Sequence, residues 1–228
     1  MLFVDIADGA VEVSLLDALS VPFECGAPVR SFPSYRGQRN FPGFYYAACM
    51  GSLVGFESWL ERDEAMAMDF DPGIEAFAPQ PFRLAWVDGS GDRSHVPDFF
   101  ARRADGTGIV VDCRPPNRIQ QRDRELFDAT ARVCAAVGWE FRLVGGHDPI
   151  WLANVRWLAG YRHVRYQVEP SSSRLLEVFA EPMALADGAA LVGDPVAVFP
   201  VLYHLLWTHR LRADLATRLE GWSMVGTP

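Results

Sequence analysis

Apolar and polar residues alternate at the periods of helices and strands over the first two thirds of the chain. Helical spacing marks residues 55–70, where a Glu-rich stripe borders the apolar face. The segment 108–114 is nearly all apolar, which is typical of a strand buried on both faces. The pattern predicts, in chain order, a helix over 55–70, strands over 80–87, 93–103 and 108–114, a helix over 118–138, a strand over 139–145 and a helix over 148–162. We therefore predict an α/β fold with an αβββαβ core and a further helix.

The C-terminal part of the chain has a different pattern. The segment EPSSSR at 169–174 has the composition of a linker. Beyond it, two or three short helices precede two strand-like segments, 210–215 and 219–225. The sequence therefore predicts two domains, 1–168 and 169–228, of which the second is small, helical and similar to a winged helix.

Composition places the chain in a broad class. Half of its 228 residues are apolar, which is enough for a sizeable core, and no run of apolar residues is long enough for a membrane-spanning helix. The first residues, MLFVDIADGA, carry acids and no base, which argues against a signal peptide. The four cysteines have neither metal-ligand spacing nor a disulfide framework. We expect a cytoplasmic protein without a membrane partner.

Charge is unevenly distributed. The net charge of −8 disfavours nucleic acid as a partner, but residues 97–174 hold 12 Arg against 9 acids and are the only net-positive third. All 21 cationic residues are arginine, for which biased codon usage is the simplest explanation. No side chain can therefore act as a lysine.

Candidate chemistry is concentrated in this basic third. Asp98 follows a proline on one predicted strand, and Asp112 interrupts the apolar run of the next, with Arg114 two positions later on the same face. A buried charge is costly unless it is paired or binds a metal. Two carboxylates joined through a short turn repel one another, and Mg²⁺, with Mn²⁺ as a possible substitute, is the cation that suits them. Glu61 or Glu57, one helical turn apart, can supply a third acid.

Other assignments stay open at this point. Asp112 and Arg114 can instead form an ordinary structural ion pair. His95 stands three positions before Asp98, so on a continuous strand it is expected to point to the opposite side and to have a structural or surface role.

Several arginines beside the motif are candidates for contacts with DNA phosphates. Arg102 and Arg103 follow the PD dipeptide, and Arg118, Arg122 and Arg124 lie at the start of the next predicted helix. As scattered charges on a strand and a helix, they are equally compatible with solvated faces.

These residues carry a resemblance. An acid on the first helix, PD on one strand and an acid two positions before a base on the next resemble the restriction-endonuclease-like PD-(D/E)xK nucleases. More narrowly, residues 31–166 resemble the TnsA-type endonuclease subunits of heteromeric transposases. The matching stretches are FPGFYYAACMGSLVGFESWLERD, PQPF, HVPDFFARRADG, VVDCRP and GWEFRLVGG.

The resemblance implies a function and a site. It favours Glu61 over Glu57, makes Glu61, Asp98 and Asp112 the metal ligands, and puts Arg114 at the family's lysine position. The expected protein is a Mg²⁺-dependent endonuclease that cuts the non-transferred strand of double-stranded DNA at transposon ends through a metal-activated water. Its expected partners are an RNase-H-fold transposase and an AAA+ ATPase regulator, which a winged-helix-like C-terminal domain would contact.

The arginine departs from the family pattern. Arg114 stays protonated and cannot act as a general base, although its planar group can hold a phosphate. Two further hypotheses remain: a catalytically silent adaptor that binds DNA or partner proteins, and a stand-alone nuclease for repair or defence.

Overall fold

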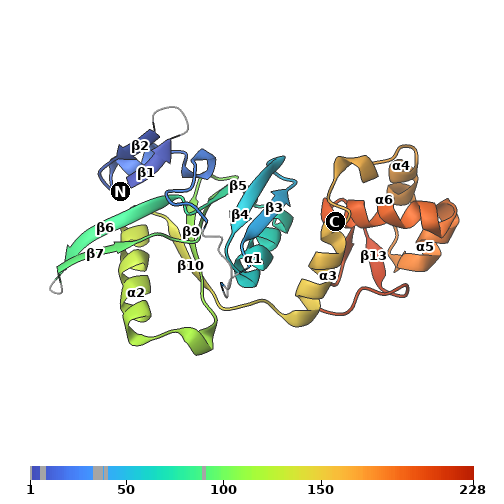
Figure 1. The fold of residues 1–228 in the computed structure, drawn as a ribbon. Coiled ribbons are helices and arrows are strands. Elements are labelled where there is room, and N and C mark those ends of the chain that lie inside the picture. The colour runs from blue at the N-terminus through green and yellow to red at the C-terminus, as the bar shows by residue number, and fades with distance from the viewer. Residues whose placement is uncertain (1, 6–8, 33–37, 39–40, 89–90) are drawn as a thin grey trace. The chain divides into compact units, whose positions relative to one another are not determined.

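The computed structural model describes residues 2–5, 9–32, 38, 41–88 and 91–228 (Figure 1). The chain divides into two compact units, Met1–Gly146 and His147–Pro228, here called the first and second units. Each is an α/β structure in its own right, so the predicted α/β class is confirmed.

The first unit holds the predicted strands and both long amphipathic helices. Its elements are β1 (Leu2–Asp5), β2 (Gly9–Glu12), η1 (Asp17–Ser20), η2 (Phe23–Cys25), β3 (Gly43–Ala47), β4 (Ser52–Phe56), α1 (Trp59–Phe70), β5 (Ile74–Pro79), β6 (Phe82–Asp88), β7 (Gly91–His95), β8 (Phe99–Arg103), β9 (Gly108–Cys113), η3 (Pro116–Arg118), α2 (Gln121–Ala136) and β10 (Glu140–Val144).

A four-stranded mixed sheet of order β10-β9-β8-β5 lies at the centre of this unit. β9 runs antiparallel to β8 and parallel to β10, and β5 runs antiparallel to β8. α1 packs against β5 and β9 while α2 packs against β10, so the two helices flank the sheet (Figure 1). Along the chain, α1, β5, β8, β9, α2 and β10 follow in the order αβββαβ, with β6 and β7 of another sheet between β5 and β8, whereas the prediction had the segment 80–87 in the place of β5.

Two of the four strands predicted between residues 80 and 145 differ from those found in the central sheet. The predicted strand 80–87 is β6, which belongs to a separate sheet of order β2-β1-β6-β7. The predicted strand 93–103 is broken into β7 and β8, because Pro97 cannot donate to a ladder and the chain changes sheet there. The remaining central strand, β5, was not predicted.

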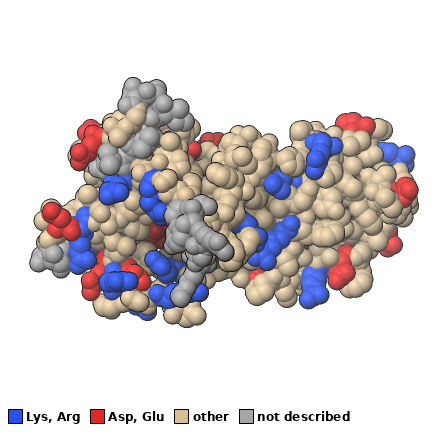
Figure 2. Space-filling view, viewed as in Figure 1, with Lys and Arg blue, Asp and Glu red and all other residues tan. Residues whose placement is uncertain are grey.

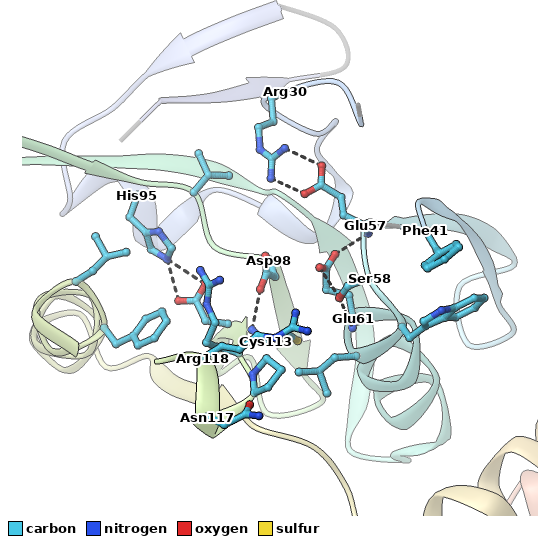
Figure 3. Close-up of a pocket in the computed structure, with 18 residues that line it drawn as sticks. Arg30, Phe41, Glu57, Ser58, Glu61, His95, Asp98, Cys113, Asn117 and Arg118 are labelled. Carbon is cyan, nitrogen blue, oxygen red and sulfur yellow. Dashed lines mark hydrogen bonds and ion pairs between the residues drawn. The ribbon is translucent and has the colours of Figure 1, made fainter. Parts of the chain in front are cut away.

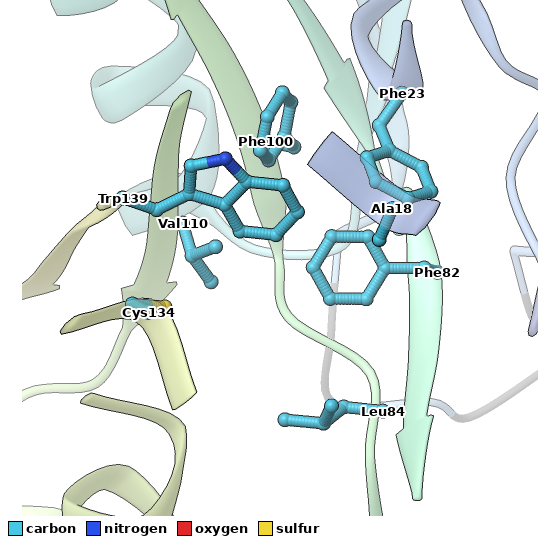
Figure 4. Close-up of a cluster of buried hydrophobic side chains, with 8 residues drawn as sticks. All are labelled: Ala18, Phe23, Phe82, Leu84, Phe100, Val110, Cys134 and Trp139. Atoms are coloured by element: carbon cyan, nitrogen blue, oxygen red, sulfur yellow. The ribbon is translucent and has the colours of Figure 1, made fainter. Parts of the chain in front are cut away.

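An aromatic cluster fixes the sheet against its surroundings (Figure 4). The Phe23 ring packs edge-on against Phe82, Phe100 and Trp139 at centroid distances of 4.8, 5.5 and 5.8 Å. At Gly108 a Cβ atom would lie 2.7 Å from the Phe100 ring, so β9 approaches this cluster as closely as a glycine allows. The cluster thereby holds β8, which begins directly after Asp98, and β9, which ends with Asp112 and Cys113, in fixed register.

α1 is held from its other side by the β3–β4 hairpin. Asp69 is buried near the helix end and accepts hydrogen bonds from the Tyr45 hydroxyl at 2.7 Å and from the Cys49 backbone N–H at 2.8 Å. The burial of this carboxylate is thus compensated by two donors from the hairpin. Because α1 is fixed in this way, the side chains of its first turn have defined positions.

The second unit is built from short helices and a small sheet. Its elements are α3 (Pro149–Ala159), η4 (Val164–Tyr166), α4 (Ser171–Val178), β11 (Met183–Ala184), α5 (Leu185–Val192), α6 (Pro195–Trp207), β12 (Arg212–Ala213) and β13 (Met224–Gly226). The strands form a sheet of order β11-β13-β12, in which β12 and β13 pair antiparallel as the two C-terminal strand-like segments suggest. Along the described part of the chain, no single helix is long and apolar enough to cross a membrane, and only α5 and α6 taken together, bent by 119°, have that length and composition.

The boundary between the units lies earlier than the predicted division into 1–168 and 169–228. α3 belongs to the second unit because it packs on α6. The Asn154 side chain on α3 also donates to the Leu215 and Thr217 carbonyls, at 2.9 and 2.7 Å, and accepts from the Leu219 N–H at 3.0 Å. The linker-like EPSSSR segment instead runs into α4.

Candidate active site

A cleft of about 770 Å³ in the first unit collects the acids that the sequence singled out (Figure 3). Glu61, Asp98 and Asp112 all line it, and so does Arg114. The antiparallel register of β8 and β9, with Phe99 opposite Val111, brings the two aspartates to the same end of the strand pair. We call this feature the carboxylate cleft.

Asp98 lies just before β8 and is held by the neighbouring strand. Its carboxylate accepts a hydrogen bond from the Cys113 N–H at 2.7 Å. Burial raises the pKa of Asp98 well above its usual value, and the charges of Asp112 and Glu61 raise it further, while Arg114 opposes the shift. The three acids are therefore close enough to repel one another, which is the condition expected of a site for a cation.

Asp112 is only 3% exposed and is held by His95. The Nε2 atom of His95 lies 3.0 Å from one carboxylate oxygen and 2.8 Å from the other. The prediction that His95 points away from the acids is wrong, because β7 ends at His95 and the chain turns at Pro97 before β8 begins.

Glu61 owes its place to the start of α1. Ser58 is the N-cap and its hydroxyl accepts from the Glu61 N–H at 3.2 Å, while Glu61 accepts from the Ser58 hydroxyl at 2.8 Å and from the Glu57 N–H at 2.7 Å. This reciprocal arrangement resembles a capping box and explains why the helix begins at residue 59 rather than at 55. Burial raises the pKa of Glu61, against the lowering effect of these hydrogen bonds.

Glu57, the alternative third acid, also lines the cleft but is engaged elsewhere. Both of its oxygens accept from the guanidinium group of Arg30, at 2.7 and 2.8 Å (Figure 3). Of the two candidate glutamates, Glu61 is among the main causes that raise the pKa of Asp98.

The cationic candidates fall into two groups. Arg114 and Arg118 line the cleft, are exposed, and form no ion pair with any carboxylate in the described part of the chain. Arg114 therefore does not form the structural ion pair with Asp112 that the sequence allowed.

The other proposed phosphate contacts lie outside the cleft lining. Arg102 pairs with Glu24 at 3.1 Å and Arg103 with Glu140 at 2.9 Å. Arg122, on the first turn of α2, is 78% exposed. On the face shown in Figure 2, basic side chains gather around α2 with acidic ones among them.

The donors in the cleft fit a hard divalent cation in chemical type, since three carboxylates share it and repel one another. Their present geometry does not form a ready coordination shell: among the described residues, no group of three or more His, Cys, Asp or Glu side chains is placed to hold a metal ion. Protein donors hold the carboxylates of Asp98, Asp112 and Glu61 in their present positions.

Sequence reasoning missed three features of the cleft. It placed His95 on the wrong side, although Pro97 was a signal that the strand is interrupted. The pairing of Arg30 with Glu57 and the lining residue Phe41 come from a segment with no periodic pattern, so the sequence offered no signal for them.

Comparison with known proteins adds no family assignment. No family model and no curated protein matches the chain.

Proposed function

We propose that the protein is a Mg²⁺-dependent DNA endonuclease subunit of a heteromeric transposase. The observation that carries this proposal is the convergence of Glu61, Asp98 and Asp112, from three separate elements, in one cleft that also contains Arg114. The αβββαβ order of the first unit supports a restriction-endonuclease-like core, in agreement with the resemblance of the motifs.

The three acids would hold the metal, with Mn²⁺ as a substitute for Mg²⁺. When bound, the ion supplies Lewis-acid polarisation of a phosphoryl oxygen and a lowered pKa of water. Asp112 is kept in place by His95, and Asp98 by the Cys113 N–H. Glu61 is oriented by the cap of α1, so each ligand has a supporting donor.

Arg114 takes the place of the family's lysine. It is exposed at the cleft and lies close enough to lower the pKa of Asp98, so its charge acts where the acids meet. Its planar guanidinium group can bind two oxygens of a phosphate and stabilise the charge that develops on it. It cannot take up a proton, so the role is electrostatic and positional.

The transposition context follows from the resemblance. The substrate would be double-stranded DNA at transposon ends in the cytoplasm, with cleavage of the non-transferred strand. The second unit, in which the β12–β13 pair follows four α-helices, would be the winged-helix-like part that contacts the RNase-H-fold transposase or the AAA+ regulator.

A cleavage assay tests the proposal. Supercoiled plasmid carrying a transposon end is incubated with the protein, the partner transposase, the regulator and Mg²⁺. We expect Asp112→Asn to reduce strand cleavage by at least about 100-fold, and Arg114→Ala by about 100- to 1000-fold, the usual cost of one preorganised donor. Arg114→Lys should retain most activity.

Asp128→Asn provides a matched control, since Asp128 is an exposed acid on α2 outside the cleft. Cleavage by Asp112→Asn at the rate of the unmodified protein would remove the metal-site assignment.

A catalytically silent adaptor is the second candidate function. It is favoured by one observation: all three acids already have protein donors, and no group in the described residues is arranged for a metal. Calorimetric titration with Mn²⁺ in the presence of DNA separates the two. Equal, negligible heats for the unmodified protein and Asp98→Asn would favour the adaptor, whereas heat lost in the variant would favour the nuclease.

A further inference from the structure

Two aromatic side chains are exposed at the lip of the carboxylate cleft. Phe41 is 58% exposed and Trp59 is 49% exposed, and both line the cleft. Their rings are stacked, with centroids 5.5 Å apart and planes inclined by 25°. Large aromatic side chains in contact are usually buried, and an exposed pair beside a polar cleft marks a binding surface. We call Phe41 and Trp59 the aromatic pair.

The Trp59 ring is held in place by its neighbours. The Arg62 guanidinium group lies 4.3 Å from the ring centroid, and Arg62 is itself anchored because it donates to the Asp63 carboxylate at 2.8 Å. Phe56 lies 6.4 Å away in a tilted arrangement. A ring that is already fixed loses little conformational entropy when a ligand stacks on it.

The surroundings of the aromatic pair favour a nucleic acid over an apolar ligand. In Figure 3, Phe41 lies at the end of the cleft opposite His95, with Asp98 and Glu61 between them. Arg114 and Arg118 line the same cleft and are exposed without ion pairs among the described residues. Aromatic rings combined with guanidinium groups are the combination that binds bases and phosphates of single strands.

We infer that the aromatic pair, with Phe41 as its outer ring and Trp59 supporting it, stacks on an unpaired nucleobase next to a phosphate bound by the arginines of the cleft. Bases inside an intact duplex are stacked on one another and do not present their faces to a protein ring. The preferred form of the substrate is therefore double-stranded DNA that is locally opened at the cleavage position, and a single strand serves as a probe for the opened bases. This inference rests on the proposed function, since it specifies the form of DNA that enters the same cleft.

Binding measurements without cleavage test it. The full chain, with Ca²⁺ in place of Mg²⁺, is titrated into fluorescein-labelled oligothymidine and into a labelled duplex of equal length, and anisotropy is recorded. We expect tighter binding to oligothymidine, and a loss of about tenfold on that probe for Trp59→Ala and for Phe41→Ala, the size expected for one stacked base. Duplex binding should change by less than about twofold, since stacking contributes little there.

Two variants serve as controls. Trp59→Phe keeps a ring and should bind oligothymidine nearly as well as the unmodified protein. Trp222→Ala removes a tryptophan that is 75% exposed in the second unit and should change neither affinity. Circular dichroism of each variant establishes that the fold is retained.

Three results would overturn the inference: no binding to either probe, oligothymidine affinity unchanged by Trp59→Ala, or equal losses on both probes. A fourth contradicting result comes from sedimentation: Trp59→Ala dissociates a dimer and leaves DNA affinity unchanged. The aromatic pair would then contact a second copy of the chain. The proposed function fails separately, by plasmid cleavage that does not depend on Asp112. If the binding results hold and no cleavage is found, the cleft would be a binding site for single-stranded DNA and not a nuclease site.

Discussion

Asp98 is a residue whose charge is strongly disfavoured by its surroundings. Its pKa is raised by burial, by Asp112 and by Glu61, so the folded protein favours the neutral acid. The folded protein therefore binds this proton more tightly than the unfolded chain does. This contribution to the unfolding free energy is complete below pH 3.8, the usual pKa, and is lost as the pH rises through the folded-state pKa. At neutral pH, burial of the Asp98 charge therefore lowers the unfolding free energy of the metal-free protein.

The variant Asp98→Asn removes that cost. Without metal at neutral pH we expect it to melt above the unmodified protein, by roughly 2–4 °C for each kcal/mol gained. The difference should grow as the pH is raised and shrink on acidification, which thermal melts at a series of pH values would measure. Added Mn²⁺ should stabilise the unmodified protein and not the variant. A difference that is constant with pH would contradict this account of the shift.

His95 makes a second prediction at this scale. It is the donor that both oxygens of the buried Asp112 share. Replacing it by alanine leaves a buried acceptor without this partner, at a cost of about 1–3 kcal/mol in unfolding free energy. The supporting donor of a metal ligand also typically contributes about 10- to 100-fold in metal affinity.

Calorimetric Mn²⁺ titration should therefore show weaker binding for His95→Ala than for His95→Gln, whose amide can still donate. A merely structural role would lower the melting temperature and leave the affinity unchanged. If His95→Ala bound Mn²⁺ more tightly, the imidazole would instead be competing with the metal for Asp112.

Among the elements, the strands that carry the aspartates differ in how far the sequence predicts them. The segment GIVVDC was predicted as a buried strand and is β9. A nearly all-apolar run of this length is most stable as a strand that is buried on both faces. The short turn from β8 to β9 also placed Asp98 beside Asp112 correctly. Local pattern and turn length were sufficient for this pair.

The elements on either side show where sequence reasoning stops. The segment IEAFAP at 74–79 has weak strand propensity. It forms β5 because it pairs with β8, a strand that is distant in sequence and reaches it only in the folded protein. The break between β7 and β8 depends on β6 pairing with β7, with Leu84 opposite His95. Tertiary pairing, which period-2 alternation cannot reveal, therefore decided which side of the acids His95 occupies.

Over the whole molecule, the basic middle third is less basic at its surface than its composition suggests. Arg102 and Arg103 are used in ion pairs with Glu24 and Glu140, and such pairs add no net charge for DNA. The chain as a whole carries a charge of −8. DNA binding by this chain alone should therefore be weak and salt-sensitive, which fits a subunit that acts with partners better than a stand-alone nuclease.

The division of the chain into units leads to a final prediction. The sequence places the boundary after 168, but α3 lies in the second unit through its packing on α6 and the three hydrogen bonds of Asn154. A fragment of residues 147–228 should therefore unfold cooperatively on heating. A fragment of 169–228, which lacks α3, exposes an apolar face of α6 and leaves the segment around Leu215 without its donor.

Circular dichroism melts of the two fragments measure this difference, and Asn154→Ala in the longer fragment isolates the hydrogen bonds from the apolar packing. That variant should lose about 1–3 kcal/mol of unfolding free energy, because two backbone carbonyls and one N–H lose their partner together. The shorter fragment should lose more, since it also gives up the packing of Val155 and Leu158, which are buried on α3. Equal melting of both fragments would mean that α3 is an appendage of the second unit and that the linker-like segment is the true boundary.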